Sequence, residues 1–245
     1  MSREADPAVI ELADVTKVFR SGEVSVDALR GVSFAVHERE FVAIMGPSGS
    51  GKTTLLGILG CLDRPTEGSY KLVGQEMSTL DETRRARVRG DRIGFVFQAY
   101  NLIPRTTAYK NVELPLVYAG VAGGERRGRV LQALASVGLA ERVDHLPNQL
   151  SGGEQQRVGI ARALVVEPSV ILADEPTGNL DSASAEEVLA ILGRLNEEGA
   201  TIVMVTHSRQ VAEHASRIVR FADGLVVADE STERVRSAAP LGAVG

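Results

Sequence analysis

The stretch Phe41-Val42-Ala43-Ile44-Met45-Gly46-Pro47-Ser48-Gly49-Ser50-Gly51-Lys52-Thr53-Thr54 decides the fold of this chain. Residues 41–45 are almost wholly apolar, which is typical of a strand covered on both faces. Residues 46–53 fit the pattern G-x-x-x-x-G-K-[ST], and an apolar helix is expected to begin near Lys52. A buried strand, a glycine-rich loop and a helix in this order indicate an α/β fold.

The glycine-rich loop is predicted to bind the phosphates of a nucleoside triphosphate. Its glycines let backbone N–H groups converge on phosphate oxygens, and the positive end of the helix dipole adds to them. Lys52 can reach the β- and γ-phosphates, and the Thr53 hydroxyl can bind Mg²⁺. The alternative is a purely structural turn, which the strand before the loop and the helix after it disfavour. The predicted phosphate-binding residues are Gly46, Pro47, Ser48, Gly49, Ser50, Gly51, Lys52, Thr53 and Thr54.

A second element distinguishes between the many kinds of protein that carry such a loop. Val170 to Ala173 form an apolar run that ends in two adjacent carboxylates, Asp174 and Glu175. Asp174 is predicted to hold Mg²⁺, directly or through water, and Glu175 to polarise the water that attacks the γ-phosphate. The alternative, two solvated acids at a strand end, loses weight because a phosphate loop precedes them.

The rest of the chain predicts two further regions around this core. Short β-like runs before residue 41 indicate an antiparallel β lobe, and apolar residues at helical spacing make the middle mostly helical. Strand and helix patterns alternate beyond Pro168, which favours a parallel sheet. The β-like runs are Val9–Leu12, Val15–Phe19 and Val32–Val36, and the helical ones are Val130–Val137 and Gly153–Val166. From about Glu230 onward we expect an untethered tail.

Composition bounds the function. The chain has 245 residues with a formal net charge of −5, so a partner bound mainly through nucleic-acid phosphates is disfavoured. Cys61 is the one cysteine, so no internal disulfide can form and a reducing compartment is expected. No stretch approaches 18 uncharged apolar residues, and Met1 to Pro7 lacks the features of a signal peptide. We therefore expect a cytoplasmic protein unless something tethers it.

The stretch Leu150-Ser151-Gly152-Gly153-Glu154-Gln155-Gln156-Arg157 resembles the LSGGQ signature of ABC ATPases, with Glu154 in place of the usual Gln. Physically, it offers a hydroxyl and bare amides at a helix N-terminus, a second anion site about 100 residues after the first. A flexible loop or a simple helix cap is the alternative for these residues taken alone. Further motifs follow the order of that family: Gln98 resembles the Q-loop, Asn179-Leu180-Asp181 the D-loop, and His207 the switch histidine.

The resemblance covers residues from about Val9 to Asp229 and implies a P-loop NTPase core with an N-terminal antiparallel β lobe and an inserted helical lobe. As a single ABC ATPase domain over 1–245, the chain would have its catalytic core and β lobe at about 8–97 and 166–230. The helical lobe would lie at about 98–165 and a flexible tail at 231–245. ATP and Mg²⁺ would bind in a head-to-tail homodimer, between one subunit's P-loop and its partner's signature.

The same resemblance assigns roles to individual residues. Gln98 would contact Mg²⁺ and water, and His207 would bind the γ-phosphate and hold the water with Glu175. Asp181 would reach the partner's P-loop, although a helix N-cap is its strongest alternative. Phe19 would stack on adenine, where the family commonly has Tyr and where a core residue is the alternative. The predicted catalytic residues are Glu175, His207, Gln98 and Lys52, the metal ligands Thr53, Gln98 and Asp174, and the signature contacts Ser151, Gly152 and Gly153.

Two stretches, 59–68 and 95–104, resemble the lipoprotein-release and macrolide-export branch of the family. That resemblance implies a separate integral membrane permease and a place on the inner face of the plasma membrane. The permease would dock near Gln98–Pro104, where Tyr100, Leu102 and Ile103 form an apolar patch, or these three would simply pack the helical lobe. The alternative function is a nucleotide-sensing scaffold that regulates a membrane-associated or cell-wall enzyme. A DNA-repair type would need a long coiled coil between Lys52 and Leu150, where only 97 residues lie.

Overall fold

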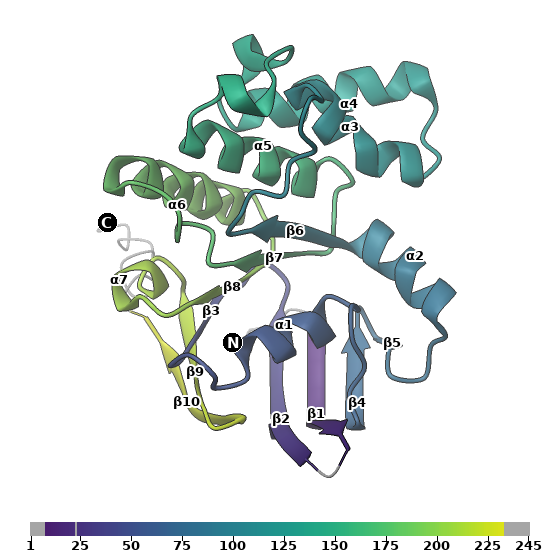
Figure 1. Cartoon of the computed structure of the whole chain (residues 1–245), viewed down its shortest axis with the longest axis vertical. Helices are drawn as coiled ribbons and strands as arrows, with labels where there is room; N and C mark the ends of the chain where they lie inside the picture. Colours follow the sequence, from purple (N-terminus) through teal and green to yellow (C-terminus); the bar gives the residue numbers. More distant parts are fainter. Residues whose placement is uncertain (1–7, 23, 233–245) are drawn as a thin grey trace, which may run out of the picture.

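A six-stranded sheet forms the centre of the computed structural model, which describes residues 8–22 and 24–232 (Figure 1). The strand order is β10-β9-β3-β8-β7-β6, and only the edge strand β10 is antiparallel to its neighbour. The bounds are β3 Phe41–Met45, β6 Ile93–Phe97, β7 Val170–Asp174, β8 Ile202–Thr206, β9 Arg217–Ala222 and β10 Leu225–Ser231. The predicted α/β fold with a mostly parallel sheet is confirmed.

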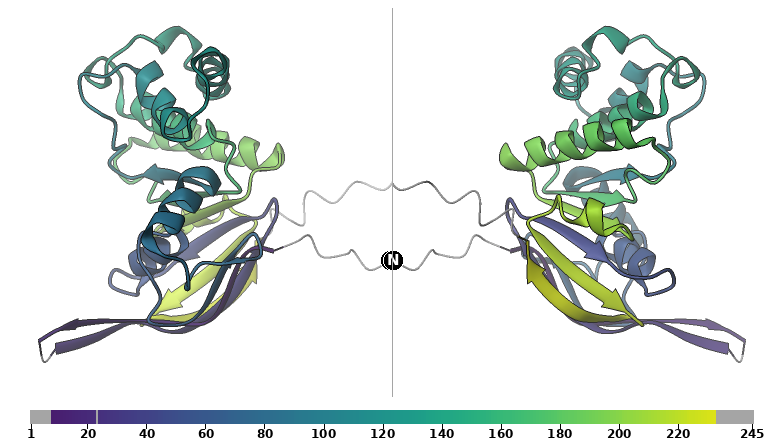
Figure 2. Two further views of the ribbon diagram at one scale, coloured as in Figure 1. Left: turned by 90° about the vertical axis from the view of Figure 1, so that its right-hand side faces the viewer. Right: turned by 90° about the vertical axis from the view of Figure 1, so that its left-hand side faces the viewer.

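An antiparallel sheet of order β2-β1-β4-β5 forms the predicted N-terminal β lobe, with β1 Ala8–Ser21, β2 Val24–His37, β4 Glu67–Leu72 and β5 Gln75–Glu76. The first two strands form a long hairpin that projects from the body (Figure 2). Two of the predicted runs belong to one strand, because the register shift between Leu12 and Val15 accommodates Asp14 at φ 50° without ending the pairing.

Two apolar cores lie on opposite faces of the central sheet. Side chains alternate along a strand, so Val42 and Ile44 pack with α1 and the β lobe while Phe41 and Ala43 pack with the other helices. The helix α1 spans Lys52–Leu59. The helices α3 (Ala108–Tyr118), α4 (Gly123–Ser136), α5 (Gly152–Leu164) and α6 (Ser182–Glu197) cover the opposite face. The shorter or peripheral helices are α2 (Glu82–Arg92), α7 (Arg209–Ala212), η1 (Ala140–Arg142) and η2 (Pro147–Gln149).

Sequence patterns missed several elements. No strand was predicted at β4, β5 or β10, and the helix α3 was not singled out. The expected tail begins too early, because Glu230 and Ser231 belong to β10 and Glu230 pairs with Arg220. The remainder of that tail from residue 233, and Met1 to Pro7, lie outside the described residues. In the described part of the chain, none of the helices has the length and apolarity needed to span a bilayer.

Candidate active site

The glycine-rich loop of residues 46–53, the P-loop, surrounds the side chain of Lys52. Its ammonium group donates to the carbonyl oxygens of Gly46 and Pro47, at 2.7 Å each, and the side chain is largely buried. Gly49 and Gly51 have φ values of 81° and 101°, which a glycine adopts without strain. No side chain caps α1, because Gly51 is its N-cap. The amides of the first turn therefore remain available to an anion.

A cavity of about 750 Å³ lies over this loop. Its walls include most of the predicted phosphate and metal residues: Ser48, Gly49, Gly51, Lys52, Thr53, Thr54, Gln98, Asp174 and Glu175. It also has walls that the sequence analysis missed: Val26, Asp27, Ala28, Arg30, Val205, Asp223 and Gly224. Gly46, Pro47 and Ser50 do not line the cavity, but they complete the loop beneath it.

The two carboxylates at the end of β7 have different surroundings. Burial raises the pKa of Asp174, the charge of Glu175 raises it further, and Lys52 opposes both effects. Glu175 has φ 44°, and its backbone N–H donates to Val205 O at 3.0 Å. Its Oε1 lies 2.8 Å from Nδ1 of His207, whose ring is largely exposed. The structure thus pairs the predicted base with the predicted histidine at the cavity edge.

The side chains predicted to bind Mg²⁺ offer the kind of oxygen ligands that this ion prefers. Thr53, Gln98 and Asp174 line the same cavity and offer a hydroxyl, an amide and a carboxylate oxygen, which suit Mg²⁺. A cation would also relieve the cost of keeping Asp174 charged beside Glu175. Across 8–22 and 24–232 no group of three or more His, Cys, Asp or Glu side chains could hold a metal by itself. The residues therefore fit a Mg²⁺ ion that keeps water and phosphate oxygens as its other ligands.

Gln98 is fixed by the D-loop. Its amide nitrogen donates to Asn179 Oδ1 at 3.2 Å, and Asn179 Nδ2 donates back to Gln98 O at 3.1 Å. A Cβ at Gly178 would come within 2.7 Å of Gln98 Nε2, so a larger residue there would displace the Gln98 side chain. This reciprocal pair links two motifs 81 residues apart, and sequence analysis had no signal for it.

The signature residues lie apart from this cavity. Ser151 Oγ accepts from Glu154 N at 3.1 Å and Glu154 Oε2 accepts from Ser151 N at 2.8 Å, which is a capping box for α5. The Ser151 N–H and Arg142 hold the pKa of Glu154 below its usual value. Gln could form the same capping box, but only Glu adds the ion pair with Arg142, at 3.1 Å. Ser151, Gly152 and Gly153 do not line the P-loop cavity.

Asp181 and Phe19 also lie outside the cavity lining. Asp181 caps α6 by accepting from Ser184 N and Ser184 Oγ, at 3.0 and 2.8 Å, and these bonds lower its pKa. Phe19 is 46% exposed, and Lys17 Nζ lies 4.9 Å from the centre of its ring. Its cross-strand partner is Val26, which lines the cavity, so Phe19 stands beside the entrance.

Known proteins share this architecture. The ABC transporter family profile matches residues 29–178. An uncharacterised ABC transporter ATP-binding protein of Thermotoga maritima is 57% identical over 218 residues, 89% of this chain and 93% of that protein. The macrolide export ATP-binding/permease protein MacB of Azoarcus sp. is 50% identical over 239 residues, 98% of this chain but 36% of that protein.

A solved structure of known nucleotide state is also similar to this chain. It is a dimeric, post-hydrolysis state of the ATP-binding cassette MJ0796 bound to ADP and Pi, with 48% identity and a TM-score of 0.82. The match covers 91% of this chain and 98% of that one. Fold, motif order and sequence identity all agree, and the chain belongs to the ABC transporter ATP-binding family.

Proposed function

We propose that this chain is the ATP-binding and hydrolysing subunit that powers an ABC transporter or mechanotransmission complex with a separate membrane permease. The observation that carries the proposal is the single cavity formed by Lys52, Asp174 and Glu175, with His207 2.8 Å from Glu175. The Thermotoga relative, whose name gives it as an ABC transporter ATP-binding protein and 93% of which is covered by the match, supports the ATP-binding role.

In the proposed reaction the P-loop amides and Lys52 hold the β- and γ-phosphates. Glu175 takes a proton from water as the water oxygen bonds to the γ-phosphorus. The bond from that phosphorus to its bridging oxygen breaks, which yields ADP and phosphate. His207 orients Glu175 and contacts the γ-phosphate. Thr53, Gln98 and Asp174 would hold Mg²⁺, which would neutralise phosphate charge when bound.

The active unit in this proposal is a homodimer. The cavity offers no contact from Ser151, Gly152 or Gly153, and α5 lies on the opposite face of the central sheet from α1. A γ-phosphate held at Lys52 would therefore meet a signature only from a second copy. The dimeric solved cassette with ADP and Pi is consistent with this arrangement.

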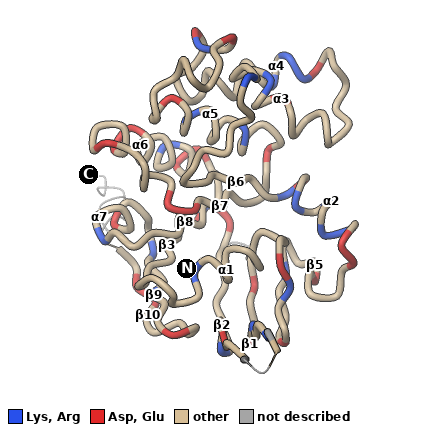
Figure 3. The backbone as a smooth tube through the Cα atoms, viewed as in Figure 1, with Lys and Arg blue, Asp and Glu red and all other residues tan. Residues whose placement is uncertain are grey.

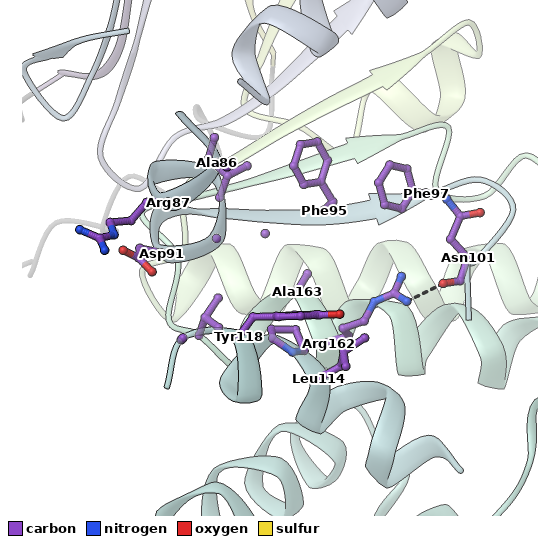
Figure 4. Close-up of a pocket in the computed structure, with 16 residues that line it drawn as sticks. Ala86, Arg87, Asp91, Phe95, Phe97, Asn101, Leu114, Tyr118, Arg162 and Ala163 are labelled. Atoms are coloured by element: carbon purple, nitrogen blue, oxygen red, sulfur yellow. Dashed lines mark hydrogen bonds between the residues drawn. The ribbon is translucent and has the colours of Figure 1, made fainter. Parts of the chain in front are cut away.

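A groove between α2, β6, α3 and α5 is the proposed permease site, with a volume of about 850 Å³ (Figure 4). Phe95 and Phe97 stack with ring centres 5.4 Å apart, and Tyr118 faces them across the groove and is 83% exposed. Arg87 of α2 lines the groove beside Asp91. Other arginines follow along the same helix (Figure 3). An amphipathic segment with an apolar face and acidic neighbours would fit this surface.

The apolar patch expected at Tyr100, Leu102 and Ile103 is corrected in part. Leu102 packs against the helical core, and the Tyr100 hydroxyl donates to Asn179 O at 3.3 Å. Ile103 remains exposed. Arg162 donates to the carbonyls of Tyr100 and Asn101, at 2.9 and 2.6 Å, and so holds this segment beside the groove.

The deciding experiment measures ATP hydrolysis and light scattering of the purified chain beside Glu175→Gln. Loss of the base should lower kcat by about 10²- to 10⁴-fold and leave an ATP-bound dimer. Glu141→Gln, an exposed change on η1, is the control and should behave as wild type. Hydrolysis by Glu175→Gln at the wild-type rate would reject the mechanism. A chain that neither hydrolyses nor dimerises would favour the nucleotide-sensing scaffold.

The groove is tested with tagged chains in cells. Tyr118→Asp should abolish co-purification of the membrane subunit and leave the ATP affinity of the purified chain unchanged. Val227→Asp on β10 is the control, because Val227 is 60% exposed and does not line the groove. Equal loss with both variants would place the permease elsewhere.

A further inference from the structure

We propose that Gly224, in the turn between β9 and β10, is a positioning residue that holds the P-loop in its phosphate-binding shape. The turn consists of Asp223 and Gly224, with φ values of 48° and 75°. It begins 170 positions after Thr53, the last residue of the P-loop, yet both of its residues line the same cavity. The inference rests on the proposed role of that cavity as the ATP site.

The peptide groups of Gly224 join the P-loop to the β lobe. Its N–H donates to Ser50 O at 3.0 Å, within the P-loop, and its carbonyl accepts from Arg30 N at 3.0 Å, in β2. Ser50 is almost completely buried, so its carbonyl has little access to water as a substitute donor. Movement of the turn would therefore leave a P-loop carbonyl without its donor.

Three backbones also meet here without room for a side chain. A Cβ at Gly224 would come within 2.8 Å of Ala28 O, and a Cβ at Gly51 within 2.5 Å of the same oxygen. The Gly51 Cβ position lies 3.6 Å from Gly224 Cα. A methyl group on Gly224 would thus push against β2 at the carbonyl that also bounds Gly51, the N-cap of α1.

The other end of the P-loop contacts β9, the strand that leads into this turn. A Cβ at Gly46 would come within 2.2 Å of Phe221 O, near the end of β9. The P-loop therefore contacts β9 at Gly46. At Ser50 and Gly51 it contacts the turn that follows β9. Because phosphate binding requires several amides aimed at one point, a shift of the turn should weaken nucleotide binding.

The chain provides a matched control in another hairpin. Val73 and Gly74 connect β4 to β5 with φ values of 48° and 72°, almost the same as those of Asp223 and Gly224. Both pairs are two-residue turns with φ above zero, as in type I′ hairpins. A Cβ at Gly74 would meet nothing within 4 Å. Gly74→Ala therefore carries the same backbone strain as Gly224→Ala without the clash.

The experiment compares the dissociation constants of a fluorescent ATP analogue and the KM and kcat of ATP hydrolysis for both variants. Gly224→Ala should raise the dissociation constant and KM at least about tenfold, whereas Gly74→Ala should stay within about twofold of wild type. A purely structural role would reduce the active fraction, and with it the apparent kcat, and leave KM unchanged. That pattern, or a Gly224→Ala variant that binds like Gly74→Ala, would overturn the inference alone.

Amide hydrogen exchange of the wild-type chain keeps the test decisive even if Gly224→Ala fails to fold. ADP should increase protection of the P-loop and of residues 222–225 together, and leave 72–75 unchanged. Protection of the P-loop without any change at 222–225 would overturn the inference. A wild-type chain that binds no nucleotide would overturn the proposed function and this inference with it.

Discussion

The N-termini of α1 and α5 are the two predicted anion sites, and they differ in side-chain capping. α1 starts after Gly51 without any side-chain cap, beside a buried lysine and two carboxylates. α5 starts with a closed capping box between Ser151 and Glu154, to which Arg142 adds an ion pair of 3.1 Å. The first end is open to a ligand, whereas at the second the amides of Ser151 and Glu154 are already paired within the chain.

The difference indicates an order of events. A nucleotide would first bind at α1, where the amides are free and the cavity exists within one chain. α5 is stable without ligand and would present Ser151 and two glycines to a nucleotide carried by another copy. In the proposed homodimer one chain would contribute two unlike half-sites, and a complete site would require two chains.

The largest expected effect comes from separating the half-sites. Lys52→Ala and Ser151→Arg should each lower ATP hydrolysis by about 10²-fold or more, since each removes one side of the phosphate grip. An equal mixture should recover activity, because a mixed dimer pairs one intact P-loop with one intact signature. The assay is steady-state phosphate release.

The control for this mixture replaces Ser151→Arg with a chain that carries both substitutions. Its mixture with Lys52→Ala contains no intact P-loop and should stay inactive. If the first mixture also stays inactive while both variants are folded and dimerise, the two halves do not complement each other and the comparison fails.

A smaller effect is expected at the entrance of the α1 cavity. Phe19→Ala should raise the dissociation constant of ATP about tenfold through loss of stacking on the base, with kcat little changed at saturation. Phe19→Tyr keeps the ring and should bind as wild type. Calorimetric titration of both variants with ATP would check this. An unchanged affinity in Phe19→Ala would mean that Phe19 has only a structural role in the β lobe.

The smallest effect concerns the capping box of α5. The pKa of Glu154 is lowered below its ordinary value of 4.5, chiefly by the Ser151 N–H. The stabilisation is therefore complete above that value and is lost as the pH falls through the lowered pKa. Glu154→Gln keeps an acceptor for the Ser151 N–H but loses the negative charge at the helix N-terminus. It should therefore cost about 0.3–1 kcal/mol at neutral pH, and the difference from wild type should shrink toward acid.

Urea unfolding at several pH values measures this difference, with the exposed Glu141→Gln as a control that should show no such trend. A gap between wild type and Glu154→Gln that is constant with pH would mean that the charge of Glu154 does not support the cap. The box would then rest on the Ser151 hydroxyl alone.

Local sequence patterns predicted the parts of the site that lie within one strand, loop or helix. The apolar run of β3, the glycines of the P-loop and the end of β7 at Asp174 all carry their signal in adjacent residues. The walls formed by Val26, Asp27, Arg30 and Asp223 had no such signal, because β2 and the β9–β10 turn reach the cavity only through long-range pairing. The hairpin turn 223–224 could have been found from its Asp-Gly pair between apolar runs, a recognised hairpin sequence.

By itself, the sequence determined the family, the order of the motifs and the residue types that can bind a triphosphate, since these depend on short spacings. Only the tertiary structure decided which of these residues share a cavity. Alternate residues of β3 pack against α1 on one face of the sheet and against the helices that include α5 on the other. Ser151, at the start of α5, and Lys52, at the start of α1, therefore belong to helices on opposite faces. That choice depends on contacts between residues far apart in the chain, which no local pattern contains.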